Sequence, residues 1–175
     1  MTHDAVQILV VDDHRENLVA LEALLAPLGH RILLADSGRA ALKILLEEEV
    51  ALILLDVSMP DVDGYEVAEL IRMRPANRDT PIIFLTANSP SAAAVFKGYS
   101  VGAVDYIFKP VSEEILISKV NIFVDLFRRS RALLRKAEAL RQAHAELDAR
   151  VRERTEQLAQ GNERLKTEVV QRRRA

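Results

Sequence analysis

Short apolar runs, each ending at a polar residue, constrain the fold of this 175-residue chain more than any other feature. Such runs precede Asp12, Asp56, Thr86 and Lys109, and they read ILVV, ALILL, PIIFL and VDYIF. Near-continuous apolar runs are typical of parallel strands that are buried on both faces. A further run, RILLA, begins at Arg31, so we expect five parallel strands.

Helical patterns lie between these runs. Leucines at helical spacing predict a first helix over residues 15–28, stopped by Gly29, and Ser37 is expected to cap a second helix. Residues 89–100 are small and alanine-rich, and they predict a poorer helix before the last strand. The alternation of strands and helices predicts an α/β fold with a doubly wound parallel sheet and right-handed crossovers.

The polar residues at the strand ends predict a metal site. The carboxyl ends of parallel strands in an open sheet converge on one crevice, so Asp12, Asp13 and Asp56 are expected to lie together there. Carboxylates about 4 Å apart repel each other by about 4 kcal/mol at an effective dielectric constant near 20. A divalent cation removes that penalty, and carboxylate oxygens are ligands that suit Mg²⁺.

The same crevice is predicted to accept a phosphoryl group. A carboxylate that attacks an anionic phosphoryl group needs nearby positive charge, which the cation and the Lys109 ammonium would supply. Thr86 can donate its hydroxyl to a phosphoryl oxygen, and the small Ala87 beside it leaves room for that group. Asp56 is the predicted nucleophile.

Charge divides the chain into two parts. Residues 1–127 hold 10 Lys and Arg against 19 Asp and Glu, a net charge of −9, whereas residues 128–175 hold 14 against 7, a net charge of +7. An acidic globular domain followed by a basic helical segment is therefore predicted, with these boundaries. The chain has no cysteine, which excludes disulfides, thiolate catalysis and cysteine-based zinc sites. It has neither an apolar run that could span a membrane nor a signal-peptide pattern, so a cytoplasmic protein is expected.

The basic segment has the pattern of a coiled coil. From Ser112 onward there is no proline and only one glycine, Gly161, so a single helix on the order of 90 Å long could run to the end of the chain. Leucines at heptad position d are seven residues apart, except for an eleven-residue stutter from Leu147 to Leu158. Asn162 at an a position favours a parallel homodimer, and small or polar residues at other a positions make it marginally stable. The predicted seam consists of Leu133, Leu140, Leu147, Leu158, Asn162 and Leu165.

Four segments resemble, in order, the signature segments of the bacterial response-regulator receiver family: VVDDHREN, LLDVSMPDVDG, FLTA and VDYIFKP. The resemblance covers roughly residues 5–127. It implies a flavodoxin-like (βα)5 fold with strand order 2-1-3-4-5. It also implies a signalling domain, not an enzyme with an external substrate: a histidine kinase or phosphotransfer protein would pass phosphate from a phosphohistidine to Asp56, and slow self-catalysed dephosphorylation would follow.

The resemblance further implies a set of magnesium ligands. The carboxylates of Asp13 and Asp56 and the backbone carbonyl of Ser58 would bind Mg²⁺. Asp12 would act on the cation largely through water.

A conformational switch and an unusual peptide bond are implied as well. Thr86 would move toward the phosphoryl group, and the aromatic ring of Tyr106 would turn inward behind it. The peptide bond between Lys109 and Pro110 is expected to be cis.

Several other acidic and histidine residues are expected to have no role in the site. Asp61 and Asp63 are expected to be turn formers. His144 lacks the acidic neighbour and the downstream proline of a kinase histidine box, and it fits a heptad position instead. His14 and His30 show no ligand spacing.

Two alternative functions fit the residues less well. A haloacid-dehalogenase-like phosphohydrolase also uses an aspartate nucleophile and Mg²⁺, but it needs a second acid two residues after the nucleophile, where Ser58 stands. A coiled-coil DNA-binding regulator would concentrate its basic residues ahead of the heptads, whereas here they alternate with acidic ones. Nucleic acid is therefore not an expected partner.

The output of the signal is expected outside these residues. The segment RVRERTEQLAQGNERLKTEV resembles signalling helices that precede kinase, sensor or cyclase domains, and the chain stops at Ala175 without a helix cap. A longer parent protein is expected, such as a hybrid histidine kinase or a diguanylate cyclase. Phosphorylation of Asp56 would then change the pairing or register of the helix and act on an attached effector domain.

Overall fold

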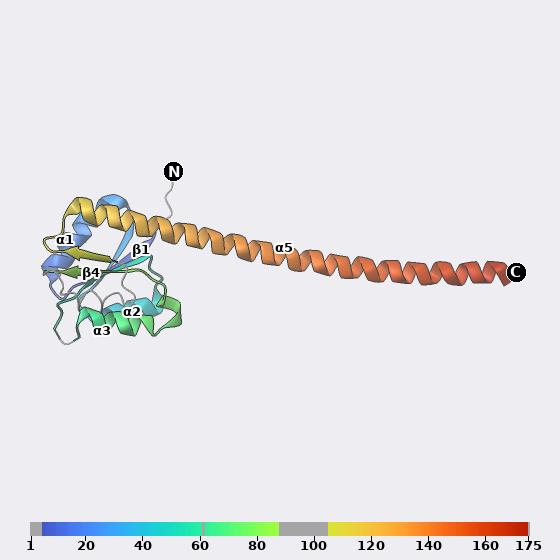
Figure 1. The fold of residues 1–175 in the computed structure, drawn as a ribbon, viewed down its shortest axis with the longest axis horizontal. Coiled ribbons are helices and arrows are strands. Elements are labelled where there is room, and N and C mark those ends of the chain that lie inside the picture. Colours follow the sequence, from blue (N-terminus) through green and yellow to red (C-terminus); the bar gives the residue numbers. More distant parts are fainter. Residues whose placement is uncertain (1–4, 61, 88–104, 175) are drawn as a thin grey trace. The chain divides into compact units, whose positions relative to one another are not determined.

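The computed structural model describes residues 5–60, 62–87 and 105–174 (Figure 1). The chain forms two compact units, Met1–Phe127 and Arg128–Ala175. Their boundary lies where the net charge of the sequence changes sign. The helix expected over residues 89–100 lies outside the described residues.

The first unit is built on one parallel sheet whose strand order, β2-β1-β3-β4-β5, confirms the expected doubly wound, flavodoxin-like topology. Its strands are β1 (Gln7–Val11), β2 (Arg31–Ala35), β3 (Leu52–Asp56), β4 (Ile82–Thr86) and β5 (Asp105–Phe108). Every residue of β3 and β4 is buried, as expected for central strands that are covered on both faces. The register pairs Val11 with Leu55 and Asp56 with Leu85, so the carboxyl ends of these strands meet at one edge.

Helices cover both faces of the sheet (Figure 1). On one side lie α2 (Gly38–Glu47) and α3 (Gly64–Arg72), and on the other lie α1 (Arg15–Leu25) and the first part of α5 (Glu113–Arg174). Each side has its own hydrophobic cluster. The α1 and α5 side buries Leu18, Leu21, Leu25, Leu116, Val120 and Val124 against the sheet.

The first helix differs from the prediction at its end. Instead of continuing to residue 28, the α-helix stops at Leu25, and Ala26–Leu28 form a short 3-10 helix, η1. Pro27 explains the change, because it has no N–H to donate to the preceding turn. Gly29 then ends the segment at a φ of 70°, a left-handed conformation that glycine adopts without strain.

Helix caps set the start of α2 and α3. The Ser37 hydroxyl accepts a hydrogen bond from the N–H of Ala40 at 3.2 Å, which confirms the predicted cap. Asp63 is more than a turn former: its carboxylate accepts the N–H of Glu66 at 2.8 Å and caps α3. The other predicted turn former, Asp61, lies outside the described residues.

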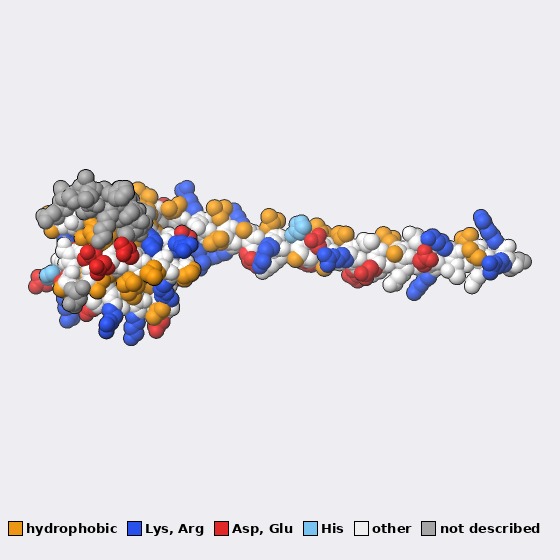
Figure 2. All heavy atoms as spheres, turned by 60° about the horizontal axis from the view of Figure 1, so that its bottom comes forward, with side chains coloured by type: hydrophobic (Ala, Val, Ile, Leu, Met, Phe, Trp, Pro, Cys, Tyr) orange, Lys and Arg blue, Asp and Glu red, His pale blue; other side chains and the backbone are white. Residues whose placement is uncertain are grey.

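The second unit contains the remainder of α5, and its apolar side chains have no core of their own. Between 60% and 71% of each seam leucine is exposed: Leu133, Leu140, Leu147, Leu158 and Leu165. Charged residues of both signs alternate with these apolar positions (Figure 2). Several form ion pairs one helical turn apart, such as Arg150 with Glu146 and Arg172 with Glu168. Within the described residues, no helix combines the length and apolarity that a membrane span requires.

Candidate functional site

Four of the predicted site residues stand at the ends of four neighbouring strands. Asp12 follows β1, Asp56 ends β3, Thr86 ends β4, and Lys109 follows β5. Asp12, Asp56 and Thr86 are buried, with 0%, 3% and 8% of their surfaces exposed. The N–H of Lys109 donates to the carbonyl of Thr86 at 2.8 Å, so β5 keeps its hydrogen-bonding pattern beyond its last residue.

The Lys109 ammonium connects two of the carboxylates. Its Nζ atom lies 2.8 Å from Asp12 Oδ2 and 2.8 Å from Asp56 Oδ1. Burial lowers the pKa of Lys109, but the hydrogen bonds to Asp12 and Asp56 outweigh that effect, and the net pKa is above the ordinary value. Lys109 is therefore a fixed positive charge at the centre of the site.

Asp56 is a buried carboxyl among other acids. Burial raises its pKa above the ordinary value, and the charges of Asp12 and Asp13 raise it further, while Lys109 opposes the shift. A positive charge added near these groups, such as a bound cation, would favour the ionised form of Asp56.

Both oxygens of the Asp12 carboxylate accept hydrogen bonds from other residues of the protein. Oδ1 accepts the backbone N–H of His14 and the amide of Asn17, both at 2.9 Å. Oδ2 accepts the Asn17 amide at 3.0 Å and the Lys109 ammonium at 2.8 Å. Three donor atoms therefore share the two oxygens of Asp12. Asp12 thus holds Lys109 in place, and Asn17, which no sequence pattern singled out, holds Asp12.

Asp13 and His14 complete the acidic edge of the site. His14 Nδ1 lies 3.0 Å from Asp13 Oδ1 and 3.6 Å from Asp12 Oδ1. Among the described residues, Asp12, Asp13 and His14 each offer one ligand atom within 4.8 Å of one another, and Asp56 is not in that group. The sequence showed no ligand spacing at His14, and the structure brings its ring beside Asp13, the preceding residue.

The loop after β3 is held tightly against α3. The N–H of Gly64 donates to the carbonyl of Val57 at 3.0 Å, and a Cβ on Gly64 would lie only 2.3 Å from the carbonyl oxygen of Asp56. Only glycine allows this approach. Ser58, whose carbonyl is a proposed magnesium ligand, is exposed two residues after Asp56.

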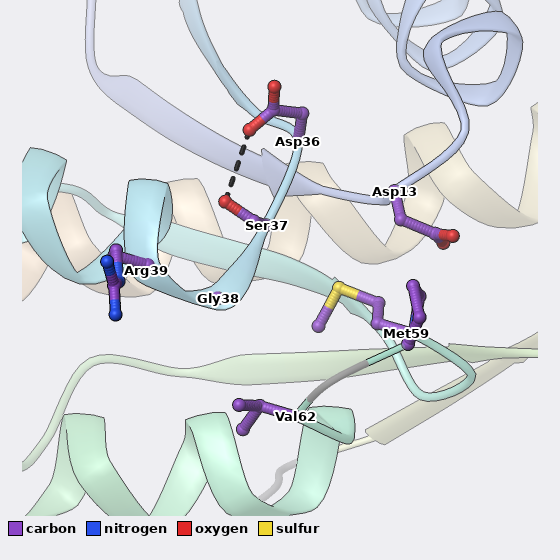
Figure 3. Close-up of a pocket in the computed structure, with 8 residues that line it drawn as sticks. Asp13, Asp36, Ser37, Gly38, Arg39, Met59 and Val62 are labelled. Carbon is purple, nitrogen blue, oxygen red and sulfur yellow. Dashed lines mark hydrogen bonds between the residues drawn. The ribbon is translucent and has the colours of Figure 1, made fainter.

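A pocket of about 520 Å³ opens beside this loop (Figure 3). Asp13 and Arg39 lie at opposite ends of it, and Met59 and Val62 line its apolar wall. The Ser37 hydroxyl donates to the Asp36 carboxylate at 3.2 Å on its rim. The pocket therefore adjoins the acidic edge without containing Asp56 or Lys109.

Tyr106 packs in a row of three aromatic rings. Its ring centroid lies 5.6 Å from that of Phe84, which in turn lies 4.7 Å from that of Tyr65. Only 9% of Tyr106 is exposed, so its side chain is buried in this structure. The peptide bond between Lys109 and Pro110 is cis, the isomer that the resemblance implied.

Comparisons with known proteins agree with this geometry. The family model of the response regulator receiver domain matches residues 8–121. A probable cyclic di-GMP phosphodiesterase of Vibrio cholerae serotype O1 is 40% identical over 133 residues, which make up 76% of this chain and 30% of that protein. The transcriptional regulatory protein ZraR of Escherichia coli K12 is 40% identical over 111 residues, 63% of this chain and 24% of that protein. The chain thus spans less than a third of either relative.

A solved structure resembles the first unit. It is the receiver domain of the sensor histidine kinase PA1611 from Pseudomonas aeruginosa PAO1, described with a magnesium ion coordinated in its active site cleft. The two are 30% identical, with a TM-score of 0.63, over 69% of this chain and 98% of that one.

Proposed function

The chain belongs to the response regulator receiver domain family, and from this premise we propose that Asp56 is its phosphoacceptor. The observation that carries the proposal is the contact between Lys109 and Asp56, which holds a cation against a buried carboxylate at the end of β3. Receivers accept phosphate from histidine kinases, and a kinase or phosphotransfer protein is the proposed donor.

In the proposed reaction, an Asp56 oxygen attacks the phosphorus of the donor phosphohistidine. A new O–P bond forms, the N–P bond breaks, and the imidazole leaves with its electron pair. Lys109 stays near the transferred group because Asp12 holds it independently of Asp56. The Thr86 hydroxyl at the end of β4 would move toward the phosphoryl group and donate to one of its oxygens, and Tyr106 on the neighbouring strand would respond to that movement.

The residues present suit a divalent cation. Asp13, Asp56 and the Ser58 carbonyl are the proposed direct ligands of Mg²⁺. Asp12, whose carboxylate already accepts hydrogen bonds within the protein, would act on the cation largely through water. Burial raises the pKa of Asp56, and the nearby charges of Asp12 and Asp13 raise it further, so a cation bound beside these acids would favour the ionised carboxylate. When bound, the cation would neutralise phosphoryl oxygens and the attacking carboxylate.

Labelling with acetyl phosphate tests the acceptor. Wild-type protein with Mg²⁺ should gain one phosphoryl group, and Asp56→Asn should gain none. Asp36→Asn is the matched control, because Asp36 is another acid near the site that has no proposed role. Phosphate that persists on Asp56→Asn would refute the assignment.

We further propose that residues 128–175 are a signalling helix that forms a parallel homodimer. The exposed leucines support this, because a lone helix leaves their apolar surface in water. The seven-residue spacing also extends back from Leu133 to Leu126, which is 58% exposed in the first unit. Phosphorylation of Asp56 would change the pairing or register of the helices and so regulate an output domain of a longer protein.

Cross-linking tests this coupling. Single cysteines at Leu140 and Leu165 should form interchain disulfides, and their yields should change when beryllofluoride mimics the phosphoryl group. A cysteine at Gln142, at the outward-facing f position of the same heptad, is the control. Equal yields at all three positions would refute the seam, and yields unchanged by beryllofluoride would refute the coupling.

A further inference from the structure

His14 lies at the edge of the site and has no role in the chemistry proposed above. We infer that its imidazole is a direct ligand of the divalent cation, so that the site combines oxygen ligands with one nitrogen and favours Mn²⁺ more than an all-oxygen site would. This inference rests on the proposed function, because the cation is the one that Asp13 and Asp56 would share.

The distances suit adjacent ligands of one ion. Two ligand atoms at right angles, each about 2.1 Å from a cation, are about 3.0 Å apart. His14 Nδ1 and Asp13 Oδ1 are 3.0 Å apart. An ion beside Asp13 could therefore be reached by His14 without a movement of the backbone.

The backbone of His14 is fixed by hydrogen bonds, while its exposed ring lies beside the Asp13 carboxylate. Its N–H donates to Asp12 Oδ1 at 2.9 Å, and its carbonyl accepts the N–H groups of Asn17 and Leu18 at 3.0 and 3.2 Å. His14 is the N-cap residue of α1, yet its side chain makes no capping hydrogen bond, and 69% of that side chain is exposed. The ring is therefore not needed for the helix and can orient toward a metal.

The chemistry of the ligands predicts the selectivity. Mg²⁺ prefers oxygen ligands and retains its water, whereas imidazole is a ligand for transition metals. Mn²⁺ accepts both carboxylate and imidazole, so an added imidazole should strengthen Mn²⁺ binding more than Mg²⁺ binding. A hydrogen bond from His14 to Asp13 would instead affect both ions alike.

Metal binding to the full chain distinguishes these roles. Mn²⁺ affinity is measured from the electron paramagnetic resonance signal of the free ion, and Mg²⁺ affinity from competition. His14→Ala should weaken Mn²⁺ binding about tenfold, a loss within the range seen when groups that support a metal are removed, and change Mg²⁺ binding much less. His144→Ala, which removes an exposed histidine of the second unit, should change neither.

Pulsed electron paramagnetic resonance supplies the direct readout. Bound Mn²⁺ should show nitrogen coupling from an imidazole in the wild type and in His144→Ala, and none in His14→Ala. Absence of that coupling in the wild type, or equal losses of Mn²⁺ and Mg²⁺ affinity in His14→Ala, would overturn the inference and leave the metal site itself intact. Unchanged Mn²⁺ affinity in Asp13→Asn and Asp56→Asn would instead overturn the proposed site.

Discussion

Removal of the Lys109 ammonium should destabilise the first unit strongly in the absence of divalent cations. Each of its two 2.8 Å contacts is worth about 6 kcal/mol of attraction at an effective dielectric constant of 20, before desolvation is subtracted. Deleting one partner of a buried ion pair typically costs about 3 to 5 kcal/mol. The Lys109 side chain is 24% exposed, so we expect Lys109→Met to cost about 3 kcal/mol, near the lower limit.

The cause of that loss can be isolated with a second substitution. In Lys109→Met, Asp12 and Asp56 face each other without a counter-charge. Asp56→Asn in the same chain should therefore recover part of the stability, about 1 to 2 kcal/mol, because one unpaired buried charge disappears. Mg²⁺ should stabilise Lys109→Met more than the double variant, because the single variant keeps the carboxylate.

Urea unfolding at pH 7 with a chelator present provides the measurement. All three tyrosines of the chain lie in residues 1–127, so tyrosine fluorescence reports the first unit alone. A loss below about 0.5 kcal/mol for Lys109→Met, as for an ordinary surface substitution, would refute the reasoning. So would a double variant that is less stable than Lys109→Met.

Asp56→Asn alone should stabilise the cation-free protein at pH 7. Burial raises the pKa of Asp56 above its ordinary 3.8, so the folded state disfavours the ionised carboxylate. The gain in stability should vanish below about pH 3.8, where the carboxyl group is protonated in both the folded and the unfolded state. Urea midpoints measured at both pH values check this, and a gain that persists in acid contradicts it. Gly64→Ala should lower the stability of the first unit by about 1 to 3 kcal/mol and weaken phosphorylation, because the added Cβ meets the Asp56 carbonyl. Gly161→Ala has open space around it and should raise the helicity of α5. Equal shifts of the melting temperature for the two variants would contradict the close approach at Gly64. Leu140→Lys should shift the protein toward monomer in sedimentation measurements and leave labelling of Asp56 unchanged, and an unaltered association constant would remove Leu140 from the seam.

The strand pattern predicted the sheet because burial on both faces leaves a strong signal in sequence. The runs that end at Asp56 and Thr86 became fully buried strands, and their common edge brought Asp12, Asp56 and Lys109 into contact. Composition and periodicity suffice for this level of structure, because the carboxyl ends of parallel strands necessarily share one edge.

Contacts that depend on loop geometry escaped prediction. Asn17 reaches Asp12 across the first turn of α1, and His14 reaches Asp13 from the next position in the chain. No periodicity in the sequence distinguishes Asn17 or His14 from ordinary polar surface residues. Gly64 is similar, because the need for a missing Cβ arises only when α3 packs against the Asp56 carbonyl. The cap at Asp63 was detectable in principle, since an acid three residues before Glu66 is a known N-terminal pattern.

If the exposed leucines of the second unit pair as proposed, the cellular concentration of the protein would affect signalling. Leu140 is 71% exposed in the single chain, so covering it by a second copy is a bimolecular event governed by mass action. A weakly paired helix would be mostly unpaired when few copies are present and mostly paired when many are, whatever the state of Asp56. The amount of protein made by the cell would then set the baseline from which a phosphoryl group shifts the response.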